Sequence, residues 1–241
     1  MLTAAGERLV EPAREVCRWL ELARSTVEAV DGLREGRVVI ASMPSQAVSP
    51  LAGMISRFLQ SHPGVQVSVR ACGTPDDVSQ TLRIGDAELG IVATPDSSSR
   101  DGLVVHHLET QSFVLVALDA NELPGGDDPV RPVDLTDVRL IMGQPGTGMR
   151  RVADTILSTA AGSRGVVEIE HREALLPLVL AGVGVAVVSE SWRALAESAG
   201  LVVRRLATPD LLHVGLVHRP GRLSPAAEAF IGDAARSPDP H

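Results

Sequence analysis

The chain has 241 residues, a net charge of −8 and a hydrophobic content of 44%, enough for one sizeable domain or two small lobes. All 22 basic residues are arginine, which excludes lysine Schiff-base chemistry and a phosphate-loop lysine. The acidic balance argues against a chain that binds nucleic acid by itself.

No apolar run reaches the length of a membrane span, and residues 1–20 interleave charged residues with short apolar steps. We therefore expect no signal peptide, no membrane partner and a cytoplasmic location. Cys17 and Cys72 lie in segments of different character and have no partners at metal-ligand spacing. We expect neither a disulfide nor a metal nor a cofactor.

Apolar residues in the first 36 positions follow a heptad pattern, stepping alternately by four and three residues: Leu9, Ala13, Val16, Leu20, Ala23, Val27 and Val30. Such a seam on a terminal helix is typical of pairing with a second helix, and packing back onto its own domain is the alternative. We expect the helix to end near Asp31-Gly32. Residues 1–36 hold five arginines against seven acids, so this helix is not a DNA-reading element.

Residues 37–69 are predicted to form a strand, a helix and a second strand. An apolar β-branched run at 38–40 leads through a polar turn into an amphipathic helix between Val48 and Leu59. The strand at 65–69 alternates apolar and polar residues. This is the opening unit of a parallel α/β sheet.

The polar turn after the first strand is a candidate binding site. Ligands of open α/β sheets bind beyond the carboxyl ends of strands, where a helix N-terminus offers N–H groups and partial positive charge. Ser42, Ser45 and Gln46 add side-chain donors and acceptors there. Ser45 could instead cap the helix, and one hydroxyl can serve both roles. Because of Pro50, we expect the helix to begin as late as Ser49 or to be distorted near its start.

The rest of the chain alternates between strands and helices, which predicts an α/β class with parallel sheets. A Pro/Gly/Asp-rich break at 121–131 marks the passage into a second lobe. We expect strands at 89–93, 103–105, 112–118, 140–142, 166–169, 183–188, 201–206 and 213–217, and helices at 74–85, 149–159, 173–180, 192–198 and 224–230.

Enzyme signatures are missing from the sequence. The glycine-rich turn 143–148 lacks a lysine and does not fit the dinucleotide fingerprint, and neither G-x-S-x-G nor H-E-x-x-H occurs. His106-His107 and the pair His213 and His218 have spacings that do not place both imidazoles on one strand face, so we interpret them as surface or edge residues. We interpret Asp127-Asp128 as a solvated turn. We therefore expect no catalytic residue and expect that the chain is not an enzyme.

Several segments, in this order along the chain, resemble segments of LysR-type transcriptional regulators. Residues 2–7 resemble the end of that family's winged helix-turn-helix, 32–38 the start of its effector domain, and 58–65 its F-x-x-x-hydrophilic-P-x-V segment. Residues 82–91 resemble its L-x-x-G-x-x-D-x-x-I element with Glu88 in place of the usual aspartate, 180–186 its late helix-to-strand turn, and 224–227 its closing helix.

The resemblance implies an α/β fold of two Rossmann-like lobes of periplasmic-binding-protein type II, preceded by a long N-terminal linker helix. It implies a remnant of the winged-helix end and a dimerisation helix in residues 1–36, followed by an effector-binding domain in 37–232 and a flexible tail in 233–241. Lobe 1 would comprise 37–105 and 209–232, and lobe 2 would comprise 106–208.

The resemblance also implies that the chain senses a small anionic metabolite in the interlobe cleft. The family's effector contacts carry over to Ser42, Met43, Ser45, Gln46, Ala93, Thr94, Gly146, Thr147 and Gly148. The family often has a hydroxyl residue where Met43 stands, which suggests a less polar effector or one hydrogen bond fewer. Arg150 and Arg151 are candidates to pair with an effector carboxylate or to remain solvated.

The expected partners are a small-molecule effector and further copies of the chain. The resemblance implies a dimer or a tetramer formed through the N-terminal helix and the effector domain. Residues 1–6 are too few for a recognition helix, so we expect DNA binding only in a full-length form, with this chain a fragment, a misplaced start or a natural truncation. The alternative is a stand-alone solute-binding protein of the same fold, which we expect to be monomeric.

Overall fold

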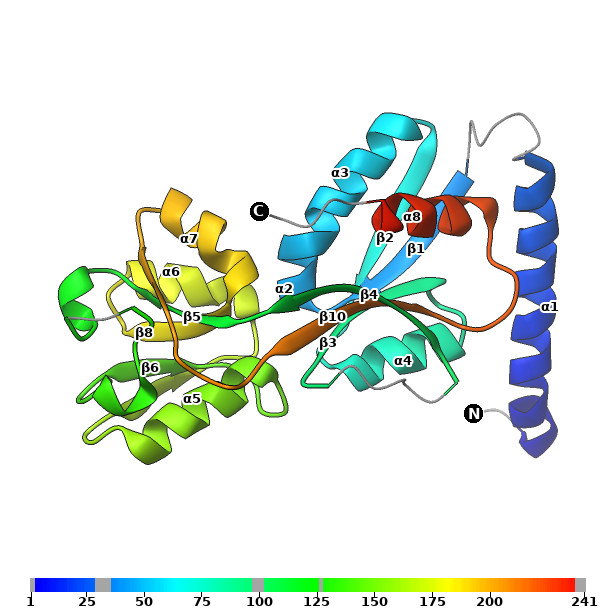
Figure 1. The fold of residues 1–241 in the computed structure, drawn as a ribbon. Helices are drawn as coiled ribbons and strands as arrows, with labels where there is room; N and C mark the ends of the chain where they lie inside the picture. Colours follow the sequence, from blue (N-terminus) through cyan, green and yellow to red (C-terminus); the bar gives the residue numbers. More distant parts are fainter. Residues whose placement is uncertain (1–2, 29–35, 97–101, 126–127, 237–241) are drawn as a thin grey trace. The chain divides into compact units, whose positions relative to one another are not determined.

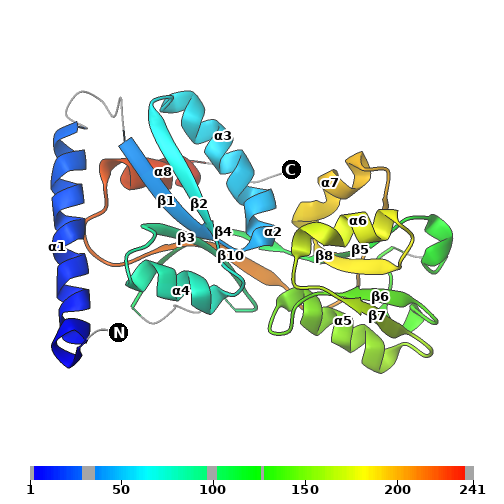
Figure 2. The ribbon, with the colours of Figure 1, turned by 180° about the vertical axis from the view of Figure 1, so that it is seen from behind.

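The computed structural model describes residues 3–28, 36–96, 102–125 and 128–236, which form two compact units (Figures 1 and 2). Unit 1 comprises residues 1–92, 98–108 and 215–241, and unit 2 comprises 93–97 and 109–214. Each unit contains one five-stranded sheet. The helix end predicted at Asp31-Gly32 and the last residues of the predicted tail lie outside the described residues.

The sheet of unit 1 has the strand order β2-β1-β3-β10-β4. Strand β1 pairs in parallel with β2 and β3, and Ser42 at its end lies opposite Ala71 and Ile91. The carboxyl ends of these three strands therefore meet at one edge of the sheet. The strands are β1 (Gly36–Ser42), β2 (Val65–Ala71), β3 (Leu89–Thr94), β4 (Val104–Gln111) and β10 (Leu212–His218).

Helices cover both faces of this sheet, with α3 and α8 on one face and α4 on the other (Figures 1 and 2). Ala41 of β1 packs with Val78 and Leu82 of α4 in a buried cluster. Phe58 of α3 and Phe230 of α8 meet edge to face, with ring centroids 5.1 Å apart. The helices are α1 (Ala4–Glu28), α2 (Pro44–Gln46), α3 (Ala52–Ser61), α4 (Pro75–Arg83) and α8 (Pro225–Ala235).

The helix predicted between Val48 and Leu59 is interrupted by a kink. The three-residue α2 runs into the segment η2 (Ala47–Leu51), where Ser49 has extended dihedrals (φ −157°, ψ 135°) before Pro50. The proline lacks an N–H and forces the preceding residue out of helical geometry. The expected distortion is confirmed, whereas a start as late as Ser49 is wrong because the first helical turn already begins at Pro44.

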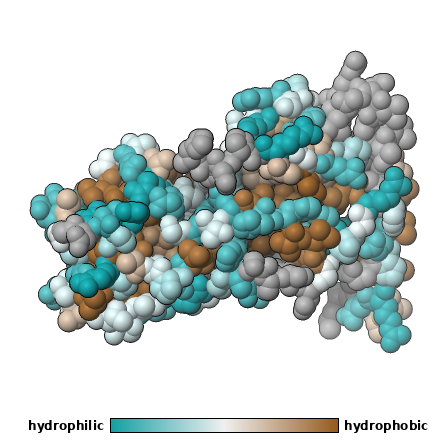
Figure 3. All heavy atoms as spheres, in the orientation of Figure 1, coloured by the Kyte–Doolittle hydropathy of each residue, from teal (hydrophilic) through white to brown (hydrophobic). Residues whose placement is uncertain are grey.

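Helix α1 presents apolar residues to solvent. Figure 3 shows brown spheres along the edge of the molecule on which α1 lies. Leu9, Val16 and Leu20, which share the predicted seam, are 64%, 59% and 66% exposed. Across the described ranges of the chain, no helix combines the length and apolar character needed to cross a membrane.

The sheet of unit 2 is mixed, with the order β7-β6-β8-β5-β9. Strand β6 runs parallel to β7 and β8, but β5 runs antiparallel to β8 and β9. The prediction of parallel sheets is therefore wrong for β5, which follows β4 without a helix between them. It is also wrong in unit 1, where residue numbers rise along β4 as they fall along β10. The strands are β5 (Phe113–Ala117), β6 (Arg139–Met142), β7 (Arg164–Glu168), β8 (Val185–Ser189) and β9 (Val202–Arg205).

The longest helix of unit 2, α5 (Gly148–Thr159), matches the helix predicted at 149–159. It buries Met149, Val152, Ala153 and Ile156, one face of a 3.6-residue period. The other helical segments are α6 (Leu175–Leu180), α7 (Arg193–Ser198) and the short 3₁₀ turns η3 (Ala120–Glu122), η4 (Pro132–Asp134), η5 (Arg172–Ala174) and η6 (Glu190–Trp192).

Candidate functional site

The turn after β1 is closely packed and polar. Ser42, Ser45 and Gln46 are at most 2% exposed, and Met43 is 4% exposed. The first turn of α2 begins with Pro44, so Met43 occupies the N-cap position and makes no side-chain capping bond. Ser45 therefore does not cap the helix, contrary to the alternative considered from the sequence, because the N-cap Met43 lies two residues before it and Pro44 is the first helical residue.

Hydrogen bonding at this turn leaves one buried acceptor unused. The Ser42 hydroxyl donates to the Met43 carbonyl over 3.1 Å. Gln46 Oε1 is buried and has no hydrogen-bond partner among the described residues. A buried amide oxygen without a donor is unfavourable, so an N–H or O–H group of a ligand would find a ready acceptor here.

Two further predicted contacts, Ala93 and Thr94, are the last residues of β3. Ala93 is buried, and the Thr94 hydroxyl donates to the Asp96 carbonyl over 2.6 Å. That bond holds the Thr94 hydroxyl against its own loop. Because β3 is parallel to β1, its carboxyl end lies at the same edge of the sheet as Ser42.

In unit 2, the predicted residues Gly146 and Thr147 lie in the turn between β6 and α5. Gly146 has a φ of +81°, a left-handed conformation that favours glycine. The Thr147 hydroxyl accepts from the Arg150 backbone N–H (3.3 Å) and donates to the Gln144 carbonyl (2.9 Å). Thr147 is thus a true N-cap.

Gly148 begins α5 in close packing. A Cβ at this position would lie 2.7 Å from Leu212 Cδ2 and 3.3 Å from Phe113 Cζ, so packing alone explains the glycine. The N–H groups of Gly148 and Met149 have no partner within the helix, as in any first helical turn. The amides of a 12-residue helix give this end a partial positive charge that attracts anions.

The two arginines behind this turn are bonded to protein carboxylates. Arg150 donates to Asp154 (2.9 Å) and to Glu168 (2.7 Å), and these hydrogen bonds raise its pKa. Arg151 donates to Asp210 over 3.1 Å. An effector carboxylate would have to displace these partners, so the structure weakens the role predicted for both arginines.

An open hollow of about 510 Å³ lies along α5, from the turn before the helix to Ser158. Its lining mixes the paired arginines with acidic and hydroxyl side chains, so it carries no single sign of charge. The lining residues are Pro145, Gly146, Thr147, Arg150, Arg151, Asp154, Thr155 and Ser158.

A third polar cluster, not predicted from the sequence, lies at the carboxyl end of β8. The Ser189 and Ser191 hydroxyls are 2.8 Å apart, and Ser191 donates to Gln111 Oε1 over 3.3 Å. Trp192 Nε1 is buried and has no acceptor among the described residues. The sequence signal was available, since Ser-x-Ser-Trp directly follows a buried strand. Because β8 is parallel to β6, this cluster shares a sheet edge with the turn that leads to Thr147.

The interpretation of the histidines as surface or edge residues is wrong for His218. His218 is buried rather than at the surface, and its Nε2 lies 3.0 Å from His106 Nε2 on the neighbouring strand. Asp128 is exposed, as the interpretation of a solvated turn expects, and its carboxylate accepts from Nε and the backbone N–H of Arg205, whereas Asp127 lies outside the described residues. The Arg205 side-chain bond lowers the pKa of Asp128. No group of three or more metal-ligating side chains occurs in the part of the chain that the structure describes.

Residues 31–237 match the family model of the LysR substrate binding domain. The chain belongs to the LysR family of transcriptional regulators. Its relatives include the RuBisCO operon transcriptional regulator of Acidithiobacillus ferrooxidans, 27% identical over 95% of this chain and 74% of the relative. The regulator IlvR of Caulobacter vibrioides is 24% identical over 95% of this chain and 77% of its own length.

Solved structures of LysR regulators share the fold of this LysR-family chain. CbnR superposes with a TM-score of 0.68 at 19% identity, covering 97% of this chain and 81% of CbnR. The regulatory domain of CcmR from Synechocystis PCC6803, in complex with 2-PG, superposes with a TM-score of 0.66 at 20% identity, covering 83% of this chain and 96% of that domain. The predicted family and the fold of periplasmic-binding-protein type II are confirmed.

Proposed function

We propose that this LysR-family chain senses a small anionic metabolite, and that the polar turn after β1 and the first turn of α5 each offer groups that such a ligand can bind. The observation that carries the proposal is the start of α5, where Thr147 caps the helix and the N–H groups of Gly148 and Met149 have no partner within the helix. The bound 2-PG of the CcmR domain supports a small ligand on this fold.

The unused acceptor Gln46 Oε1 adds a second requirement to the ligand. A purely anionic ligand would leave this oxygen unsatisfied. A hydroxyl or amino group beside the anionic group would donate to it and remove the cost of the unpaired acceptor. We therefore infer a hydroxy- or amino-substituted acid, bound without chemical change.

We infer that the chain performs no catalysis and acts in the cytoplasm, where transcriptional regulators such as its relatives reach DNA. Residues 1–36 would serve as linker and dimerisation segment and residues 37–232 as the effector domain. The exposed seam of Leu9, Val16 and Leu20 supports pairing between copies through α1. DNA contacts belong, in this proposal, to a full-length form.

A thermal-shift panel tests the sensing role. The acids are lactate, malate and serine, and the matched uncharged probes are lactamide, malamide and N-acetylserinamide. An acid in large excess over its dissociation constant should raise the melting temperature by several degrees, and its uncharged counterpart should not. A panel in which no acid stabilises the chain, or the uncharged probes do so equally, contradicts the proposal.

The variant Ser45→Ala places that effect at the predicted turn. It should at least halve the acid-induced shift, because it removes a buried hydroxyl from the turn. The control Ser61→Ala makes the same change at the exposed end of α3 in the same unit. Equal acid-induced shifts in both variants and the parent would show that the binding site does not include Ser45.

A further inference from the structure

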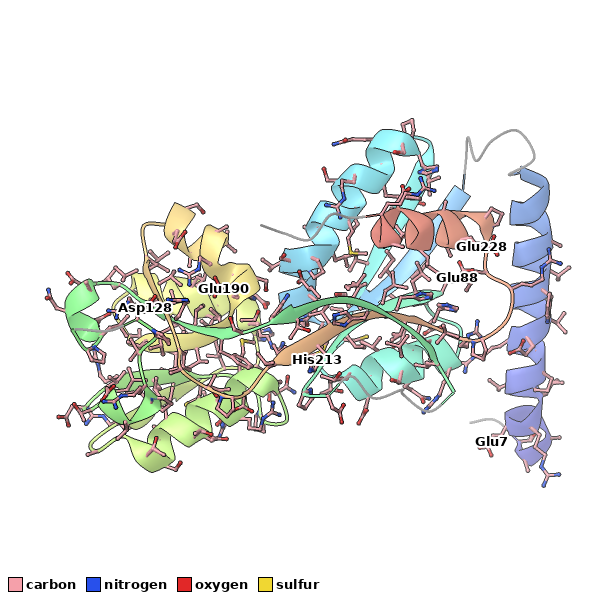
Figure 4. The ribbon with its side chains drawn as sticks, viewed as in Figure 1. Glu7, Glu88, Asp128, Glu190, His213 and Glu228 are labelled. Carbon is pink, nitrogen blue, oxygen red and sulfur yellow. The ribbon has the colours of Figure 1, made fainter. Side chains whose placement is uncertain are left out.

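The two strands that pass between the units are joined by imidazole hydrogen bonds. Strands β4 and β10 each contribute residues to both units and lie side by side in the sheet. His106 Nε2 lies 3.0 Å from His218 Nε2, and Thr110 Oγ1 lies 3.3 Å from His213 Nδ1 (His213 is labelled in Figure 4). Residue numbers rise along β4 as they fall along β10, so the two strands run antiparallel.

The two rings of His106 and His218 meet end to end. Their centroids are 5.2 Å apart and their planes differ by 18°, whereas the two Nε2 atoms are only 3.0 Å apart. A nitrogen distance so much shorter than the centroid distance means that the nitrogens point at each other. This is the geometry of an N–H···N hydrogen bond, which needs one proton between the rings.

The backbone decides which ring supplies that proton. His218 Nδ1 lies 2.7 Å from the Arg219 carbonyl oxygen. A carbonyl only accepts, so Nδ1 of His218 carries a hydrogen and Nε2 of the neutral ring is a bare acceptor. In the neutral pair, His106 therefore donates its Nε2–H to His218.

Adding protons has two stages. One added proton on His106 Nδ1 keeps the bond, because a single hydrogen still lies between the two Nε2 atoms. A second proton leaves both Nε2 atoms carrying hydrogen 3.0 Å apart, so the bond breaks and the two cations repel. We propose that the His106–His218 pair is a proton-sensitive clasp, closed at neutral pH and opened by acid, between the two strands that connect the units.

None of the described hydrogen bonds or ion pairs joins His106 or His218 to a carboxylate on a neighbouring strand. Arg219, next to His218, pairs with Glu15 of α1 over 3.8 Å. His107 and Glu109 of β4 fall on the opposite face of the strand from His106. The next strand, β3, has no ionisable side chain, and Glu88 before it is bonded to Ser224.

No described bond joins the histidine pair to a charged side chain of the helices that cover this sheet. Val217 packs in the α4 cluster, so His218 points to the other face, away from the α4 residues Asp76, Asp77 and Arg83. On that other face, α8 carries Glu228, which is exposed, and Asp233, which lies 3.7 Å from His62 of α3. Arg57 lies on α3 as well, and no described bond joins it to either histidine.

The direction of the pH effect follows from the folded pKa. Burial first, and then the charge of His218, lower the pKa of His106. The unfolded chain binds a proton at the ordinary pKa of about 6.5, before the folded chain does. The clasp's contribution to stability is therefore complete above about pH 6.5 and is lost as the pH falls through the lowered pKa.

Urea unfolding at about pH 7.5 and about pH 5.5 tests the clasp. For the parent, the urea concentration at the unfolding midpoint should fall on acidification. For His106→Gln it should fall by less than half as much. The control His107→Gln removes the adjacent imidazole on the opposite strand face and should keep the parent's loss. Equal losses in the parent and His106→Gln, or a loss abolished equally by His107→Gln, would overturn the proposal.

A spectroscopic measurement on the parent chain does not depend on the folding of a variant. Long-range ¹⁵N–¹H correlation spectra at neutral pH should show His218 as the Nδ1–H tautomer and His106 as the Nε2–H tautomer. Amide exchange in β4 and β10 around the pair should accelerate at low pH beyond the intrinsic rate. Finding both rings in the Nε2–H form would overturn the proposal.

Discussion

At the scale of single residues, Thr147 shows how one hydroxyl can serve structure and binding together. Its oxygen accepts from the Arg150 N–H, and its hydrogen goes to the Gln144 carbonyl. The amides that α5 leaves for a ligand are those of Gly148 and Met149, which the cap does not use. The cap fixes the direction in which those amides point.

Replacing Thr147 with valine should therefore cost stability as well as effector binding. The variant keeps the shape of the side chain but removes the cap, at a cost of about 0.5–2 kcal/mol in the free energy of unfolding. Urea unfolding measures this cost. Thr155→Val is the control, because its hydroxyl donates only to the Arg151 carbonyl one turn earlier in α5. Equal costs in the two variants would show that capping is not the cause.

Residue-level prediction worked where chemistry is local and failed where partners come from distant positions. The turns containing Ser45 and Thr147 were predicted because a strand, a polar turn and a helix follow one another in sequence. The bond from Arg150 to Glu168 spans 18 positions, and that from His106 to His218 spans 112. No local sequence pattern predicts such pairs, because it is the order of the strands in the sheet that brings the two residues together.

At the scale of elements, Glu88 ties the start of β3 to the start of α8. Its carboxylate accepts from the Ser224 backbone N–H (2.5 Å) and hydroxyl (2.7 Å), at the positive end of the helix (Figure 4). The resemblance marked this position as a departure from the usual aspartate. The glutamate supplies a carboxylate that accepts from the N-cap residue Ser224.

Glu88→Ala should destabilise the chain by about 1.5–3 kcal/mol, since it removes hydrogen bonds to a charged group. Chemical denaturation provides the measurement. Glu228→Ala removes an exposed acid from the first turn of the same helix without breaking a described bond to another element, and it should cost about 0.3–1 kcal/mol. If Glu228→Ala cost as much as Glu88→Ala, helix charge rather than the tie would explain the effect.

Most elements could be predicted from the sequence because their periodicity is clear, as in α5, where the apolar positions repeat every three or four residues. The antiparallel direction of β5 could not, because a fully buried run such as Phe113–Ala117 looks the same in either direction. The kink at Ser49 was predicted in kind, from Pro50, but the earlier start at Pro44 was not, because Met43 is a poor capping residue.

At the scale of the whole molecule, the exposed seam of α1 predicts association between copies. Val16→Glu combined with Leu20→Glu places two charges on the seam and should reduce the mass measured by light scattering after gel filtration. Arg8→Glu is the control, since it changes charge on the same helix outside the seam. A parent that is already monomeric would contradict pairing through α1.

The central proposal is that residues of both turns contact the acid that the chain senses. Backbone amide NMR spectra of the ¹⁵N-labelled chain, titrated with the acid that stabilises it most, test this claim directly. The account predicts that the largest shift changes fall on Ser45 and Gln46 and on Gly148 and Met149, with one common dissociation constant. Changes confined to one turn, or centred on residues outside both, would contradict it.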